Sequence, residues 1–261
     1  MFTRVPKLKK DFILLTVRFG STRLPGKCML PFSSSIQTKE SVLEHVVNRA
    51  KVSNREIIVC TSLNDADDSI VELCKKNEIN FFRGSEENKI KRWYDCFVKN
   101  GIDMAHLLDV DDPFFCNDEI NSSMDLHKKK GKLILATSKS KSGNASVGIT
   151  IGLKHLALLN KEISPTKSVE MVDDLLEKYL KYDTLEMQSL DPIPSGTRLT
   201  LDYFEDYLAL SVIKSKLGTH ATREEVNSLI FDYPWITKLN GMKNVEWKTR
   251  QNRILESQED T

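Results

Sequence analysis

Short apolar runs alternate with helix-like patterns through the first 110 residues of the chain. The runs fall at residues 12–17, 57–60, 79–82 and 104–110. Most are apolar at consecutive positions rather than at every second one, which is typical of strands buried on both faces of a parallel sheet. The pattern therefore predicts a series of strands that are joined by helices.

Helix signals stand between these strands. Ser41 and Glu44 form the sequence pattern of a capping box, and Asn64 or Asp65 can cap the next helix. The apolar positions between residues 90 and 97 recur at helical spacing. Strands and helices in alternation predict a three-layer, Rossmann-like α/β fold with a mostly parallel sheet. Ligands of such sheets bind beyond the carboxyl ends of the strands.

The second half of the chain is less regular. We expect strands at residues 133–137, 147–153 and 198–202, with a polar turn at 139–144. Helices are expected at 168–182 and 204–216, and Thr222 with Glu225 caps a final helix. Polar residues at 252–261 predict a frayed tail. We expect one domain over residues 1–261.

Composition excludes several classes of protein. Lys and Arg total 38 against 37 Asp and Glu, a net charge of +1, whereas a protein that coats nucleic acid usually needs a strongly basic face. The five cysteines are odd in number and widely spaced, which argues against a zinc site or a disulfide framework. No apolar run approaches the ~20 residues of a membrane helix, and residues 12–17 are too few for a signal-peptide core. We therefore expect a cytoplasmic protein that binds neither nucleic acid nor membrane.

The loop after the first strand, residues 18–27, carries the first candidate chemistry. It reads R-x-G-S-T-R-L-P-G-K, with three cations, two glycines and two hydroxyls. Glycines let backbone N–H groups approach an anion, and Arg and Lys donate charge-assisted hydrogen bonds. The spacing differs from that of the Walker loop. The loop is either a phosphate-binding site or a solvated basic turn.

Two aspartates, Asp111 and Asp202, each stand at the end of a predicted strand. Mg²⁺ prefers carboxylate, water and phosphate oxygens, so this pair beside a cationic loop would suit a metal–triphosphate. The alternative for a lone aspartate at a strand end is a helix N-cap. Asp109 and Asp112 crowd Asp111, and adjacent carboxylates repel one another unless a cation lies among them. The identity of the metal ligand is therefore open among these three.

Five segments in order resemble the acidic-sugar cytidylyltransferases, which include the 3-deoxy-manno-octulosonate and acylneuraminate cytidylyltransferases. The similarity is greatest to the branch typified by the spore coat polysaccharide biosynthesis protein F. The matching segments are the loop at 18–27, T-S-x-N-x-x-D-D at 61–68, F-R-G-S-E at 82–86, D-x-P at 111–113 and R-L-T-x-D-Y-x-E-D at 198–206. Five matches at corresponding places are far more specific than any one of them.

The resemblance implies a nucleotidyltransferase fold and the transfer of CMP from CTP to an acidic sugar for surface glycan biosynthesis. It implies that Arg18, Arg23 and Lys27 are catalytic and that Asp111 and Asp202 hold Mg²⁺. It also implies that the loops bind the nucleotide through Gly20, Ser21, Thr22, Gly26, Thr61, Ser62, Arg83, Gly84 and Ser85. The family further implies a homodimer.

Residues 140–197, the expected acceptor and dimer segment, depart from the family. The related branch has an H-V-T-P-Y-like element where this chain reads S-V-E-M-V-D at 168–173. The acceptor is therefore open: a keto-acid sugar, another sugar, or a small phosphorylated or phosphonylated alcohol. Two rival functions also stand, a nucleotidyltransferase that uses another nucleoside triphosphate and a non-catalytic nucleotide-binding protein.

Overall fold

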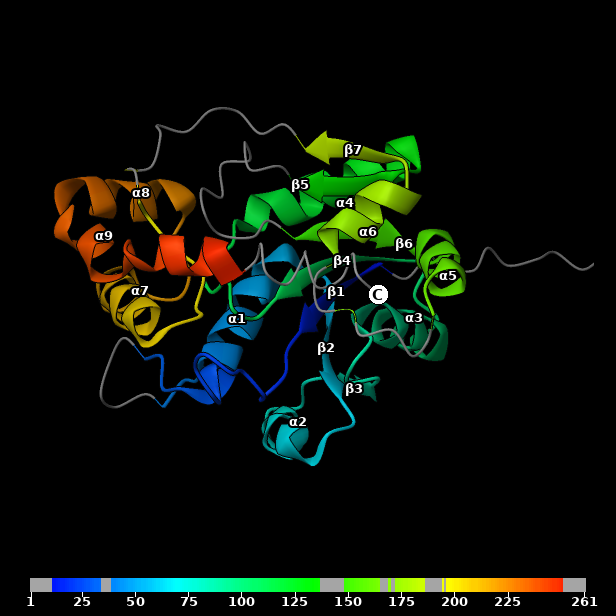
Figure 1. Ribbon diagram of the computed structural model, residues 1–261, viewed down its shortest axis with the longest axis horizontal. Coiled ribbons are helices and arrows are strands. Elements are labelled where there is room, and N and C mark those ends of the chain that lie inside the picture. The colour runs from blue at the N-terminus through cyan, green and yellow to red at the C-terminus, as the bar shows by residue number, and fades with distance from the viewer. Residues whose placement is uncertain are drawn as a thin grey trace, which may run out of the picture.

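The computed structural model describes residues 11–33, 39–136, 148–164, 169, 172–185, 194 and 196–250. These residues form a seven-stranded sheet of order β3-β2-β1-β4-β6-β5-β7 (Figure 1). Its strands are β1 (Asp11–Thr16), β2 (Glu56–Ser62), β3 (Phe81–Gly84), β4 (Met104–Asp109), β5 (Leu133–Ala136), β6 (Ile149–Gly152) and β7 (Tyr182–Leu185). Only β6 runs antiparallel to its neighbours, β4 and β5. The predicted α/β fold with a mostly parallel sheet is confirmed.

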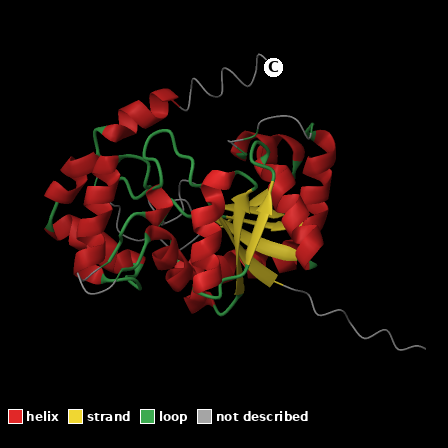
Figure 2. Ribbon diagram, turned by 90° about the horizontal axis from the view of Figure 1, so that it is seen from below, coloured by secondary structure: helices red, strands yellow, loops and turns green. Residues whose placement is uncertain are grey.

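Helices cover both faces of the sheet (Figure 2). They are α1 (Val42–Ala50), α2 (Asp68–Lys76), α3 (Lys89–Asn100), α4 (Asn117–Lys130), α5 (Leu153–Glu162), α6 (Asp173–Tyr179), α7 (Phe204–Leu217), α8 (Arg223–Asp232) and α9 (Trp235–Asn240). The predicted capping boxes form at Ser41 with Glu44 and at Thr222 with Glu225. In the described part of the chain, no helix has the length and apolarity that crossing a membrane requires.

The central strand β1 shows why the sheet lies between two helical layers. Alternate side chains of a strand point to opposite faces. Ile13 and Leu15 pack with residues of α1, α2, α4, α7 and α8, while Phe12 and Leu14 pack with residues of α3, α5 and α6. Each of these β1 side chains is at most 4% exposed. The continuous apolar run at 12–17 therefore reflects burial on both sides of the sheet.

The structure corrects the predicted turn at Arg83 and Gly84. Both residues belong to β3, because the parallel ladder pairs Thr61 with Arg83 and Ser62 with Gly84. It also corrects the predicted strand at 198–202. Leu201 donates its N–H to the carbonyl of Asp111 at 2.7 Å, but no ladder follows. The alternation of apolar residues there reflects burial of side chains in the core.

The predicted helix at 168–182 is also wrong in extent. Val169 forms a bridge with Asn88, α6 begins at Asp173, and Tyr182 starts β7 by pairing with Leu133. Sheet pairing thus overrides helical periodicity at both ends. The sequence patterns did not predict α5, and the helix capped by Thr222 is followed by α9. The predicted turn at 139–144 and the tail at 252–261 lie outside the described residues.

Candidate active site

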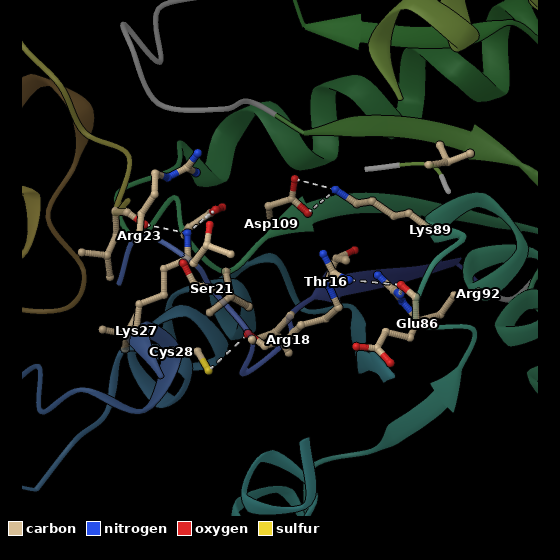
Figure 3. A pocket seen from close by; sticks show the side chains of 18 of the residues that line it. Thr16, Arg18, Ser21, Arg23, Lys27, Cys28, Glu86, Lys89, Arg92 and Asp109 are labelled. Carbon is tan, nitrogen blue, oxygen red and sulfur yellow. Dashed lines mark hydrogen bonds and ion pairs between the residues drawn. The ribbon is translucent and has the colours of Figure 1, made fainter. Parts of the chain in front are cut away.

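A cavity of about 450 Å³ opens beyond the carboxyl ends of β1 and β4 (Figure 3). Its wall is formed by residues of seven segments: Thr16, Val17, Arg18, Gly20, Ser21, Thr22, Arg23, Lys27, Cys28, Val42, Glu86, Lys89, Arg92, Asp109, Val110, Asp111, Val169, Leu201 and Arg250. Seven residues of the sequence-predicted site are among them: Arg18, Gly20, Ser21, Thr22, Arg23, Lys27 and Asp111. The position agrees with the rule that ligands of such sheets bind at the carboxyl ends of the strands.

The loop at 18–27 folds back on itself. The N–H of Gly26 donates to the carbonyl of Phe19 at 3.1 Å, and Gly26 has φ 67°, in the left-handed region. A Cβ at Gly26 would meet the Phe19 ring at 3.0 Å. Only glycine therefore suits this turn, which directs Lys27 inward at the start of a short 3₁₀ turn, Lys27–Met29.

Asp67 anchors this loop to the end of β2 through hydrogen bonds. Its Oδ1 accepts the N–H of Phe19 at 2.7 Å, and its Oδ2 accepts the hydroxyl of Thr61 at 2.8 Å and that of Ser62 at 2.5 Å. Burial raises the pKa of Asp67, but the hydrogen bonds from Ser62, Phe19 and Thr61 outweigh it and leave the pKa below 3.8. Thr61 and Ser62, predicted to contact the nucleotide, are at most 1% exposed and hold Asp67 instead.

We expect Asp67→Asn to destabilise the protein by about 1–3 kcal/mol, because an amide cannot accept all four hydrogen bonds that the carboxylate receives. Since the folded-state pKa is lowered, the contribution of the carboxylate is present above pH 3.8 and is lost as the pH falls through the folded pKa. The difference in free energy of unfolding between wild type and Asp67→Asn, measured by urea denaturation, should therefore become smaller in acid. Equal stability at neutral pH would contradict this role.

Lys27 lies between the two predicted metal ligands. Its Nζ is 2.8 Å from Asp111 Oδ2 and 3.0 Å from Asp202 Oδ1, and it also donates to the Leu201 carbonyl at 2.8 Å. Asp202 is 2% exposed and accepts two more cationic donors, Arg23 at 2.5 Å and Arg198 at 2.6 Å. The structure thus brings together the loop and two aspartates that are 91 positions apart, since 202 − 111 = 91.

The charges of this cluster stabilise one another. Burial lowers the pKa of Lys27, but Asp111 and Asp202 raise it well above its ordinary value. Burial raises the pKa of Asp202, yet Lys27 and Arg23 hold that pKa below its ordinary value. The ammonium therefore stays protonated and the Asp202 carboxylate ionised at neutral pH.

The donor set suits a hard divalent cation. Asp111 and Asp202 converge on a single ammonium, so their oxygens can share one cation. Across the described ranges, no group of three or more His, Cys, Asp or Glu side chains is arranged to hold a metal. Mg²⁺ commonly takes only one or two carboxylates and fills its remaining positions with phosphate and water.

The neighbours of Asp111 are engaged elsewhere. Asp109 accepts two hydrogen bonds from Lys89 Nζ, at 2.8 and 2.9 Å (Figure 3). Asp112 is 2% exposed and donates its N–H to the Asp109 carbonyl. Among these three aspartates, Asp111 is the one that shares a cation with Asp202.

The polar groups of Arg83, near the end of β3, and of Ser85, which follows β3, bond to other parts of the protein. Arg83 donates to the carbonyls of Ser62 and Asn64 and pairs with Asp68. The Ser85 carbonyl accepts the guanidinium of Arg92 at 2.6 Å. Seven predicted site residues are absent from the described cavity wall: Gly26, Thr61, Ser62, Arg83, Gly84, Ser85 and Asp202. Asp202 reaches the site behind Lys27.

Sequence reasoning missed several cationic residues of the site. Lys89 and Arg92 stand one helical turn apart at the start of α3, directly after the F-R-G-S-E segment, which was the available signal. Arg198 begins another recognised segment and pairs with Asp202. Arg250 lines the cavity from far along the chain, and no pattern in the sequence pointed to it.

Comparison with known proteins gives one family. Residues 12–261 match the model of the family described as Cytidylyltransferase. The spore coat polysaccharide biosynthesis protein SpsF of Bacillus subtilis is 24% identical over 221 residues, which are 78% of this chain and 86% of that protein. The uncharacterized protein MJ1063 of Methanocaldococcus jannaschii is 36% identical over 84 residues, 31% of this chain, and the match spans 32% of the length of that relative.

Solved structures show the same fold. A cytidylyltransferase from Leptospira borgpetersenii superposes with a TM-score of 0.75 at 26% identity, covering 88% of this chain and 97% of that one. A CMP:2-keto-3-deoxy-manno-octonic acid synthetase, solved in complex with CTP, superposes with a TM-score of 0.57 at 13% identity, covering 80% of this chain and 99% of the other. At that identity the second likeness concerns the fold alone.

Proposed function

This chain belongs to the cytidylyltransferase family, and we propose that it transfers CMP from CTP to an acidic sugar or a related small acceptor. Membership implies a nucleotidyltransferase. The observation that carries the proposal is the cluster of Lys27, Asp111 and Asp202 at the carboxyl ends of the central strands. A cation site and a phosphate loop at one point are what a metal–triphosphate requires.

In the proposed reaction, an oxygen of the acceptor attacks the α-phosphorus of CTP. The bond from that phosphorus to the bridging oxygen breaks, pyrophosphate leaves with the electron pair, and the acceptor hydroxyl loses its proton to solvent. Arg18, Arg23 and Lys27 neutralise the phosphates and stabilise the charge of the transition state, which is the main contribution in such transfers. Gly20, Ser21 and Thr22 line the cavity beside them.

Mg²⁺ is the proposed metal, and Asp111 with Asp202 would hold it. When bound, it would polarise the α-phosphate and neutralise charge. Lys27 occupies the position between the two carboxylates in this structure. Its ammonium would add positive charge beside a metal held by these carboxylates, and both would neutralise phosphate charge.

The opposite side of the cavity supports an acidic acceptor. Lys89 and Arg92 bring two cations to that side from the start of α3, and Asp109 balances one of them. Lys89 also lies 5.1 Å from the Trp93 ring, which holds the ammonium in place. A carboxylate or phosphonate would gain charge-assisted hydrogen bonds there. The name of the Bacillus relative mentions polysaccharide biosynthesis, which favours a sugar acceptor and a role in surface glycans. A homodimer is part of the proposal and rests on the family resemblance.

We expect CTP with Mg²⁺ to stabilise the protein by about 2.7 kcal/mol at a hundred times its Kd, and UTP, ATP and GTP to stabilise it much less. Thermal denaturation with each nucleotide measures this. Greater stabilisation by another nucleotide than by CTP would identify that nucleotide as the donor. Binding of CTP without pyrophosphate release on a broad panel of acceptors would favour a non-catalytic protein.

A further inference from the structure

The C-terminal helical segment contributes a cation to the active site. Residues 243–250 are helical and follow α9. Figure 1 shows this red segment running from α9 toward the central strands. Arg250 lines the cavity, and its Nη2 donates to the Thr22 hydroxyl at 3.0 Å. The contact joins the segment to the middle of the phosphate loop, 228 residues away in the sequence.

Two contacts hold this helical segment against Gly196 and Arg198, and Arg198 supports Asp202. Asn244 donates its side-chain amide to the Gly196 carbonyl at 3.1 Å, and the Trp247 ring lies 5.7 Å from the Arg198 guanidinium. Arg198 in turn pairs with Asp202 at 2.6 Å. The helix therefore contacts the phosphate loop directly and is linked to the buried carboxylate through Arg198. Its position is set by the same residues that organise the reaction centre.

In the part of the chain that the structure describes, Arg250 lacks the carboxylate partner that Arg23 and Lys27 have. Those two cations bond to Asp202 and Asp111, whereas Arg250 donates to a neutral hydroxyl. Within the described residues, Arg250 pairs with no Asp or Glu. A guanidinium has five N–H donors, so most of them remain for another acceptor. An Arg at a cavity wall with this fork geometry suits a phosphate group.

We propose that Arg250 binds the β- and γ-phosphates of the nucleotide and holds pyrophosphate as it leaves. This inference rests on the proposed function. Lys27, Asp111 and Asp202 mark the inner end of the site, since Asp202 is 2% exposed, and the reacting α-phosphate belongs there. Thr22, in the middle of the phosphate loop, is exposed to solvent and therefore marks the outer side of the site. The departing phosphates would lie toward that side, beside Thr22 and Arg250.

The test is isothermal titration of the full chain in Mg²⁺ buffer with CTP, CMP and inorganic pyrophosphate as probes. We expect Arg250→Ala to weaken CTP and pyrophosphate about tenfold or more, the effect of losing a hydrogen bond to a charged group, and to leave CMP nearly unchanged. Arg250→Lys keeps the charge but not the fork and should fall between wild type and alanine. The matched control is Lys248→Ala, which removes the same charge from an exposed site two positions away and should bind all three probes like wild type.

Specific outcomes would overturn the inference. Wild-type affinity for CTP in Arg250→Ala would do so, as would an equal loss of CMP affinity, which would indicate a general change in the site. An equal loss of CTP and pyrophosphate affinity in Lys248→Ala would indicate a general effect of positive charge rather than a contact made by Arg250. Thermal denaturation without ligand checks that each variant is folded, and the lysine variant serves if the alanine variant is not. Failure of the wild type to bind CTP would instead refute the proposed function itself.

Discussion

Replacing Lys27 with alanine should lower kcat at least a hundredfold, because the loss of one preorganised charged contact to the transition state costs about 3–4 kcal/mol of barrier. Lys27 is the residue that the phosphate loop directs inward, and its Nζ contacts both Asp111 and Asp202. No other cation of the described cavity wall bonds to both carboxylates. The effect should therefore fall on turnover more than on the binding of CTP.

The measurement is pyrophosphate release with CTP, Mg²⁺ and an acceptor found by screening. Lys27→Ala should remain folded, since Asp202 keeps its bonds to Arg23 and Arg198. Lys51→Ala provides the control, because Lys51 is exposed and its side chain bonds only to Asn48 among the described residues. Turnover near that of wild type in Lys27→Ala would remove this residue from the mechanism.

The second large effect is expected for Asp202→Asn, which should cost about 3–5 kcal/mol of stability as well as activity. Asp202 is buried, and its carboxylate accepts Arg23, Lys27 and Arg198. An amide in its place leaves these cations without their shared negative charge. It also removes one of the two carboxylates proposed to hold Mg²⁺, so the Mg²⁺ concentration needed for activity should rise.

Asp111→Asn separates the loss of stability from the higher requirement for Mg²⁺. Asp111 is 28% exposed, and among the described residues its carboxylate pairs with one cation, Lys27, so its loss should disturb the fold little. Both variants should need more Mg²⁺, but only Asp202→Asn should lose much stability in urea denaturation. Equal stability of Asp202→Asn and Asp111→Asn would contradict the stabilising role of the three cations around Asp202.

The first half of the fold could be predicted because its signals are local. A strand such as 12–17 is buried on both faces, so all its positions except Thr16 are apolar, and caps such as Ser41 with Glu44 mark helix starts directly. The second half was predicted less well, because its elements are set by partners. Val169 is held by the backbone of Glu87 and Lys89, and β7 exists through its pairing with β5. Neither pairing leaves a periodic pattern in the sequence.

The features of the candidate site also divide into those that local sequence patterns indicate and those that depend on distant partners. The sequence by itself determined that the loop at 18–27 follows a buried strand, that Asp111 ends another, and that five segments together indicate a cytidylyltransferase. Only the tertiary structure decided that Thr61 and Ser62 hold Asp67, that Asp109 pairs with Lys89, and that Arg250 reaches Thr22. The physical reason is that residue type and spacing carry propensity and burial. The partner of a charged side chain depends on which distant segments the sheet and the C-terminal helices bring within a few ångströms of it.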